Sequence, residues 1–509
     1  MKIQKRNQMN TNNERASGIL LHPSSLPGSY GIGTLGTEAF RFIDFLEKSK
    51  QKYWQILPLG PTGYGDSPYQ CFSSFAGNPL LINLESLEEE GLLTIADMAM
   101  MQSLDGGPVD YGNLVKLKIP VLRNAALHFL ENKNPKIADE FGVFYEDNKA
   151  WLGDYSLFMS LKGKFDLQPW QHWNNDIRMR VPEAVEKYRS ELKDEIFIQQ
   201  FIQFLFFRQW QQVKKYANSK NIKIIGDIPL YIAMDSADAW TNPELFDFDE
   251  DRNPVTVGGV PPDYFSATGQ LWGNPIFRWE THKKTGYCWW VNRMRGNLKL
   301  YDVIRIDHFR GFAAFWAVPY HDTTAINGKW VNGPGADLFK TIRKQLGNIP
   351  IIAEDLGVIT RDVEELRDSL DFPGMKILQF AFDANGANEY LPHNYPKNCV
   401  VYTGTHDNDT MLGWYQKSSP EDKAYILEYL QTDGSDICFD FIRLALSSVA
   451  NTAIIPMQDL LCENSVSRMN VPGTTMNNWM WRMKPGQAND EIAEKLAYLA
   501  HLYGRANKS

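Results

Sequence analysis

The sequence predicts an α/β protein whose core is a (β/α)8 barrel with inserted segments, and two observations lead to that prediction. Short runs of apolar and β-branched residues recur along most of the 509-residue chain, and most are continuously hydrophobic rather than alternating. Continuous runs are typical of parallel strands that are buried on both faces. Segments with helical spacing of apolar residues lie between many of these runs, which indicates repeated βα units.

Eight predicted strands follow one another along the chain, and eight is the number that closes a barrel of this kind. Each is a short apolar run that ends in polar residues: 18–23, 53–60, 222–232, 302–309, 349–357, 374–382, 398–408 and 451–461. Residues 37–50 place their apolar side chains at helical spacing. Residues 360–370 open with a threonine and acidic residues, as helices commonly do.

Two connections are too long for plain βα units. The first, about 84–221, has a mostly helical pattern, and the second, about 233–301, is rich in Gly, Pro and aromatic residues and is expected to form an extended loop. No repeat or linker marks a second domain, so residues 18–509 are expected to form one barrel with these insertions, without a C-terminal β-domain. Residues 1–17 are basic and precede no apolar stretch, so we expect a flexible tail rather than a signal peptide.

Composition excludes several classes of protein. The net charge of −9 disfavours a nucleic acid partner, and no segment approaches the roughly 18 apolar residues that span a membrane. An odd number of cysteines without a CxxC pair argues against a disulfide framework and a zinc site, and favours a reducing cytoplasm. These cysteines are Cys71, Cys288, Cys399, Cys438 and Cys462. Aromatic residues make up 13% of the chain, which suits a cleft that stacks flat, amphipathic ligands such as sugars.

Charged residues gather where predicted strands end. In a barrel, the carboxyl ends of the strands form the rim that carries the active site. Several carboxylates on one rim repel each other, which is costly unless the arrangement serves a function. The residues concerned are Asp227, Arg305, Asp307, His308, Glu354, Asp355, His406 and Asp407.

Three chemistries could use such a rim. Carboxylates can bind Mg²⁺ or Ca²⁺, can abstract a proton beside a carbonyl, or can flank a glycosidic bond as nucleophile and general acid. No lysine stands at these strand ends, no Gly-rich phosphate loop follows the late strands, and no calcium-loop signature is present. Because Trp and Tyr are abundant, glycoside chemistry without a metal or cofactor is the favoured reading.

A series of motifs covers roughly residues 18–482: LHPSSLPGSYGIGTLG, GDSPYQCFSSFAGNP, GDIPLYI, GGVPPDYFSATGQLWGNP, RIDHFRG, AEDLG, TGTHDN, PMQDLL and NVPGTTMNNWMWR. In number and order they resemble the 4-α-glucanotransferases, also called amylomaltases or disproportionating enzymes, of glycoside hydrolase family 77. The resemblance implies transfer of a 1,4-α-D-glucan segment to a new 4-position, with maltooligosaccharides, amylose or other α-1,4-glucans as donors and acceptors. It implies a retaining double displacement without a cofactor.

The same resemblance implies roles for individual residues. Asp307 resembles the nucleophile that forms a covalent glycosyl-enzyme, and Glu354 resembles the general acid/base. Asp407 resembles the third carboxylate, which holds ring hydroxyls of the sugar being cleaved. The remaining matches are supporting or sugar-contacting positions: Tyr69, Asp227, Gln270, Trp272, Arg305 and His406. Residues 258–275 match a loop that covers the acceptor side in this family.

Elementary chemistry agrees with two of these roles. Arg305 lies two residues before Asp307, so in a strand both side chains point to one face, where the guanidinium favours the ionised carboxylate. Glu354 needs a raised pKa in order to be protonated before bond cleavage. Two other readings stay open: an α-glucan hydrolase, and a non-catalytic glucan-binding protein on the same barrel.

Overall fold

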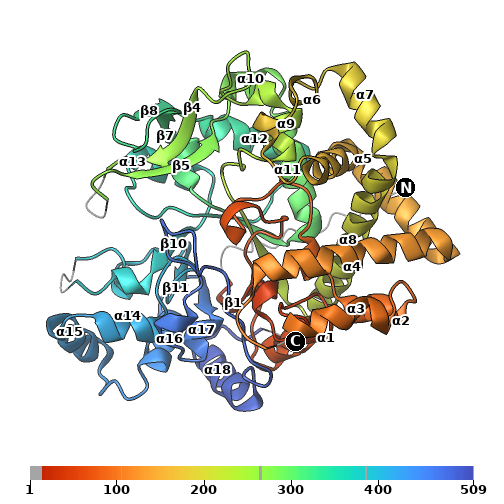
Figure 1. The fold of residues 1–509 in the computed structure, drawn as a ribbon. Helices are drawn as coiled ribbons and strands as arrows, with labels where there is room; N and C mark the ends of the chain where they lie inside the picture. The colour runs from red at the N-terminus through yellow and green to blue at the C-terminus, as the bar shows by residue number, and fades with distance from the viewer. Residues whose placement is uncertain (1–13, 105, 263–265, 384–386, 508–509) are drawn as a thin grey trace, which may run out of the picture.

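A parallel sheet of eight strands forms the centre of the molecule (Figure 1). The structure is a computed structural model that describes residues 14–104, 106–262, 266–383 and 387–507. The hydrogen-bonded order is β10-β11-β12-β1-β2-β3-β6-β9. The sheet closes where β9 meets β10, because the backbone N–H of Ala353 donates to the carbonyl of Pro373 (2.9 Å). The predicted barrel and all eight of its strands are confirmed. Their bounds are β1 (Ala16–Leu20), β2 (Tyr53–Gln55), β3 (Lys223–Ile228), β6 (Val303–Ile306), β9 (Ile351–Ala353), β10 (Gly374–Ile377), β11 (Cys399–Tyr402) and β12 (Thr452–Pro456).

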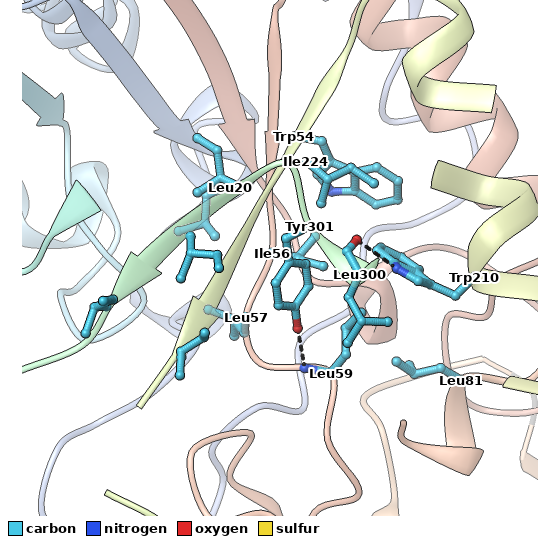
Figure 2. Packing of buried hydrophobic residues seen from close by; sticks show 14 of the residues in the cluster. Leu20, Trp54, Ile56, Leu57, Leu59, Leu81, Trp210, Ile224, Leu300 and Tyr301 are labelled. Atoms are coloured by element: carbon cyan, nitrogen blue, oxygen red, sulfur yellow. Dashed lines mark hydrogen bonds between the residues drawn. The ribbon is translucent and has the colours of Figure 1, made fainter. Parts of the chain in front are cut away.

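Burial on both faces explains why these runs are continuously apolar. In β1, Ile19 pairs with Ile455 on one side and Trp54 on the other, and all three side chains are fully buried. Figure 2 shows the aromatic packing beside β2 and β3, where the indole N–H of Trp210 donates to the carbonyl of Leu300 (3.0 Å). The polar atom of this large side chain is thereby satisfied, which lets the ring enter the core without an unpaired donor.

Helices cover the outside of the barrel. Those that lie after strands of the barrel or at its end are α1 (Thr37–Lys48), α12 (Gly335–Leu346), α13 (Arg361–Ser369), α14 (Met411–Lys417), α15 (Pro420–Leu430), α16 (Ile437–Ser447), α17 (Met457–Leu460) and α18 (Asp490–Leu502). From Met457 to Asn507, the described part of the chain forms α17, α18, loops and short turns, with no strand, as predicted. None of the helices in the described residues is long and apolar enough to cross a membrane.

The segment 84–221 forms a helical body on one side of the barrel (Figure 1). Its two longest helices, α5 and α8, pack through aromatic side chains such as Phe141 against Phe204, with ring centroids 5.6 Å apart. Its helices are α2 (Leu84–Glu89), α3 (Ile95–Met98), α4 (Tyr111–Glu131), α5 (Pro135–Lys164), α6 (Asn175–Arg178), α7 (Pro182–Glu191) and α8 (Lys193–Ser219).

The prediction of an extended loop over 233–301 is wrong. This segment holds α9 (Ala237–Thr241), β4 (Thr256–Val260), β5 (Gln270–Pro275), α10 (Trp279–Lys284) and α11 (Cys288–Leu300). The strands β4 and β5 join β7 (Ala314–Pro319) and β8 (Lys329–Asn332) in an antiparallel sheet of order β5-β4-β7-β8. The glycines that suggested a loop permit close pairing instead, because a Cβ at Gly259 would lie 2.5 Å from the carbonyl oxygen of Gln270.

Two smaller expectations also need correction. The flexible tail cannot extend to residue 17, because β1 begins at Ala16 and the Arg15 guanidinium donates to the carbonyl of Ser448 (2.8 Å); residues 1–13 lie outside the described residues. Cys438 and Cys462 form a disulfide, although their number and spacing argued against one. Their α-carbons are 5.6 Å apart because α16 packs against α17, a contact that counting cysteines cannot reveal.

Candidate active site

A cleft of about 820 Å³ opens at the carboxyl ends of the barrel strands. Its walls come from the loops after β2, β3, β6 and β11, from β5, and from residues 470–479. Six of the nine predicted site residues line it: Tyr69, Gln270, Trp272, Asp307, His406 and Asp407. The other three lie behind the lining, and each contacts a lining residue: Asp227 contacts Tyr69, Arg305 contacts Asp307, and Glu354 contacts His308.

Arg305 joins two aspartates at the end of neighbouring strands. Its guanidinium donates to both carboxylate oxygens of Asp227 (2.8 and 2.6 Å) and to Oδ1 of Asp307 (3.1 Å). Burial acts to lower the pKa of Arg305, but the charges of Asp227 and Asp307 raise it well above its ordinary value. Arg305 therefore stays charged and gives Asp307, whose side chain is 30% exposed, a fixed positive partner.

Burial raises the pKa of Asp227, and the Arg305 guanidinium opposes that rise. The Asp227 side chain is completely buried, so this ion pair forms away from solvent. A buried charge that loses its partner is strongly destabilising, which fixes the two side chains relative to each other. Asp227 thus fixes the position of Arg305, which in turn contacts Asp307.

Glu354 follows β9 and lies beside the residues that follow β6. Its backbone N–H donates to the carbonyl of Ile306 (3.0 Å), and its carboxylate accepts from the backbone N–H groups of His308 (2.6 Å) and Leu356 (2.8 Å). Burial raises the pKa of Glu354 to about 8, and the nearby charge of Asp307 adds to the rise. Glu354 is therefore mostly protonated at neutral pH, as a general acid must be.

A second group consists of Asp407 and His406, which lie in the loop between β11 and α14, and Tyr69, which follows β2 and lies beside them. The Tyr69 hydroxyl donates to Oδ2 of Asp227 (2.9 Å) and lies 3.3 Å from Nδ1 of His406, and the two rings stack with centroids 4.9 Å apart. Nε2 of His406 lies 3.5 Å from Oδ2 of Asp407. Burial raises the pKa of Tyr69 well above its ordinary value, so the hydroxyl keeps its proton.

Gln270 and Trp272 enter the cleft from β5, on the antiparallel sheet. The indole N–H of Trp272 donates to Oε1 of Gln270 (3.1 Å), and the indole meets the His308 ring edge-on at 4.7 Å. The predicted covering segment 258–275 is thus a pair of strands, with residues 263–265 outside the described residues. A flat ring beside an amide side chain can bind the apolar face and the hydroxyls of a sugar.

Two further contacts to Asp407 were not identified from the sequence. Asn470 donates from Nδ2 to Oδ1 of Asp407 (2.6 Å), and the Arg468 guanidinium donates to the Asp407 carbonyl oxygen (2.5 Å). Both donors lie at the start of the motif NVPGTTMNNWMWR or just before it, so the motif marks the segment, yet nothing local marks the contact. Among the described residues, no group of three or more His, Cys, Asp and Glu side chains is placed to hold a metal ion.

Two carboxyl groups in opposite environments at the rim of a barrel, beside a cleft lined by aromatic and amide side chains, suit the chemistry of carbohydrate-active enzymes. The family model described as 4-alpha-glucanotransferase matches residues 21–488. The chain belongs to the 4-alpha-glucanotransferase family and is an enzyme of that family.

Relatives and a solved structure support the same assignment. The chain is 51% identical to the 4-alpha-glucanotransferase of Synechocystis over 97% of this chain and 98% of that one, and 52% identical to that of Clostridium butyricum over 95% and 100%. The structure of an amylomaltase from Streptococcus agalactiae in complex with acarbose superposes with a TM-score of 0.93 at 42% identity, covering 97% of this chain and 100% of that one.

Proposed function

We propose that this chain transfers a segment of a 1,4-α-D-glucan to the 4-hydroxyl of a new acceptor by double displacement, with Asp307 as nucleophile and Glu354 as general acid/base. One observation carries the proposal. Two carboxyl groups at neighbouring strand ends have opposite environments: Asp307 is paired with a guanidinium, whereas burial raises the pKa of Glu354 to about 8. When two neighbouring carboxyl groups have such different environments, the ionised one can act as the nucleophile and the protonated one as the acid.

In the first step, a carboxylate oxygen of Asp307 bonds to C1 of the donor sugar, and the C1–O bond to the leaving chain breaks. The leaving oxygen takes the proton of Glu354, so that the chain departs as a neutral alcohol. Asp307 is now an ester without charge, which removes one of the causes that raise the pKa of Glu354. Glu354 can therefore remain ionised for the second step.

In the second step, the 4-hydroxyl of an acceptor gives its proton to Glu354 while its oxygen bonds to C1. The ester bond to Asp307 breaks, the carboxylate is restored, and the new α-linkage has the configuration of the old one. Both proton and charge balance over the two steps. Arg305 remains beside Asp307 throughout, because its contact with Asp227 is buried and independent of the sugar.

The remaining predicted residues are proposed to hold the sugars. Asp407 takes ring hydroxyls of the sugar at the cleaved bond, with His406 and Tyr69 beside it, and Gln270 and Trp272 bind the acceptor side. Donors and acceptors are proposed to be glucose, maltooligosaccharides and amylose or similar α-1,4-glucans. Transfer rather than hydrolysis requires that acceptor sugar displaces water, and the antiparallel sheet that carries β5 gives the cleft a wall for that purpose.

The cytoplasm is the proposed location. Cys71, Cys288 and Cys399 are free thiols, which supports a reducing compartment, whereas the bond between Cys438 and Cys462 favours an oxidising one. Fractionation of the producing cells with an antibody to this chain decides between the two. Recovery outside the cytoplasmic fraction contradicts the proposal.

Incubation with maltotriose tests the activity itself. Glucose, longer maltooligosaccharides and total reducing ends are followed together, for the unmodified protein and for Asp307→Asn. Longer products at a constant number of reducing ends, absent with Asp307→Asn, are expected for transfer. A steady rise in reducing ends indicates hydrolysis instead of transfer, and no change in either quantity contradicts transfer with this substrate.

A further inference from the structure

The side chain of Asp407 is held mainly from outside its own loop. The side chain is 49% exposed, and its contact within the loop is the 3.5 Å approach of its Oδ2 to Nε2 of His406. The hydrogen bond from the Asp407 backbone N–H to Thr405 Oγ1 (3.3 Å) holds the backbone but not the carboxylate. A carboxylate with that freedom can occupy several rotamers, yet a group that binds a distorting sugar must be fixed to within a fraction of an ångström. Something else must therefore set its orientation.

That constraint comes from Arg468 and Asn470, here called the Arg468–Asn470 clamp. The Asn470 amide donates to Oδ1 of Asp407 at 2.6 Å. The Arg468 guanidinium donates through one nitrogen to the Asp407 carbonyl oxygen (2.5 Å) and through Nε to the Asn470 carbonyl oxygen (2.7 Å). One planar guanidinium thus bridges the backbones of both residues and fixes where the amide can stand.

We propose that Asn470 is a positioning residue for the transfer reaction, which it serves by orienting Asp407. With Oδ1 held by the amide, Oδ2 and the remaining lone pairs of Asp407 are left for the hydroxyls of the sugar at the cleaved bond. An amide suits this task because it donates a hydrogen bond without adding a charge that would neutralise the carboxylate. The inference rests on the proposed role of Asp407 and goes beyond it by assigning the residue on which that role depends.

The loop that carries Asp407 is anchored independently of the clamp. The buried carboxylate of Asp459 accepts from the Thr403 hydroxyl (2.5 Å) and from the Met411 backbone N–H (2.7 Å), so it holds both ends of the loop. Ser465 donates to Oδ2 of Asp409 (2.8 Å) between those ends. Removal of the Asn470 amide should therefore release one side chain and leave the loop in place.

The first test is Asn470→Ala, assayed with maltotriose. We expect kcat to fall about 10- to 100-fold, the effect of losing a hydrogen bond to a charged group, with KM changed less than about threefold and the melting temperature unchanged. Val466→Ala is the matched control, because Val466 lies on the same segment and is 90% exposed. It should leave kcat unchanged, and an unchanged kcat for Asn470→Ala overturns the proposal.

A double-mutant cycle tests whether Asn470 acts through Asp407. Weak variants are assayed with α-maltosyl fluoride, a donor with an activated leaving group. If the amide serves only to orient the carboxylate, adding Asn470→Ala to Asp407→Ala should cost less than about twofold. If the two losses multiply in full, Asn470 acts by another route and the proposal fails.

Asn470→Asp gives a signature that loss of structure cannot mimic. It replaces the amide that lies 2.6 Å from Oδ1 of Asp407 with a second carboxyl group, so that the two like charges repel and a proton shared between them is favoured. Activity of this variant should recover as the pH falls, relative to Asn470→Ala, and identical pH profiles contradict the proposal. The outcomes separate cleanly: if the unmodified protein does not redistribute maltotriose, the proposed function fails, whereas an active protein with an indifferent Asn470 refutes only this inference.

Discussion

Because Glu354 has a pKa of about 8, we predict that loss of activity at alkaline pH follows this side chain and depends on the leaving group. Burial raises the pKa from 4.5, and the charge of Asp307 adds to the rise. At pH 7 a carboxyl group with a pKa of about 8 is about 90% protonated, whereas one with the ordinary value is about 0.3% protonated. The surroundings of Glu354 therefore supply about 300-fold more of the acid form.

The assay compares two donors over a pH range from about 6 to about 10. A departing sugar oxygen needs a proton and a departing fluoride does not, so kcat/KM for maltotriose should fall about tenfold per pH unit above about pH 8, while that for α-maltosyl fluoride stays level. Glu354→Gln should lower the maltotriose rate by at least about 100-fold and still release fluoride. Equal pH profiles for the two donors, or full activity of Glu354→Gln on maltotriose, refute the assignment.

Three further predictions concern stability. Since the folded-state pKa of Glu354 lies above its unfolded value, ionising it costs folding free energy as the pH rises from about 4.5 to about 8, by at most about 5 kcal/mol; urea unfolding should show Glu354→Gln gaining on the unmodified protein over that range. Asp227→Ala leaves the buried Arg305 with Asp307, which is partly exposed to solvent, as its carboxylate partner, and should lower the free energy of unfolding by about 3 to 5 kcal/mol. Cys462→Ser opens a loop closed over a sequence separation of 24 residues and should cost about 3 to 4 kcal/mol, as should reduction by a dithiol.

Each of these predictions has a matched reference. A constant difference between Glu354→Gln and the unmodified protein across the pH range contradicts the burial of that carboxyl group. For Asp227→Ala, the exposed ion pair of Arg361 with Glu365 is the comparison, because Glu365→Ala should change stability by less than about 1 kcal/mol. For Cys462→Ser, the reference is Cys288→Ser, which removes a cysteine that forms no disulfide and should leave the free energy of unfolding unchanged. Equal losses of stability in the two variants contradict a disulfide at Cys462.

The barrel could be predicted because each strand carries its own signal. Burial on both faces makes every run apolar by itself, and polar residues such as Asp307 and Glu354 mark the point where a strand emerges at the rim. The antiparallel sheet carries no such signal. Gly258 and Gly259 in β4 pair with Ala317 and Trp316 of β7, almost 60 residues on, so their local pattern reads as a loop.

Candidate site residues could be identified from the sequence where they stand at the end of a predicted strand or in a recognisable motif. Asn470 was missed because its partner Asp407 lies 63 residues away and no spacing rule connects them. The sequence could state that Glu354 needs a raised pKa, but the cause is burial of the carboxyl group beside Asp307, which is a property of the packed structure. The disulfide was missed for the same reason: pairing depends on where α16 and α17 meet.

The most direct test of the central claim is to capture the covalent bond between Asp307 and the sugar. Glu354→Gln is incubated with α-maltosyl fluoride, which needs no acid to leave, so that the second step lacks its base and the intermediate accumulates. Digestion and mass spectrometry should find one maltosyl group on the peptide that contains Asp307, and none when Asp307→Asn is combined with it. Release of fluoride with no adduct, or with the adduct on another residue, contradicts the account.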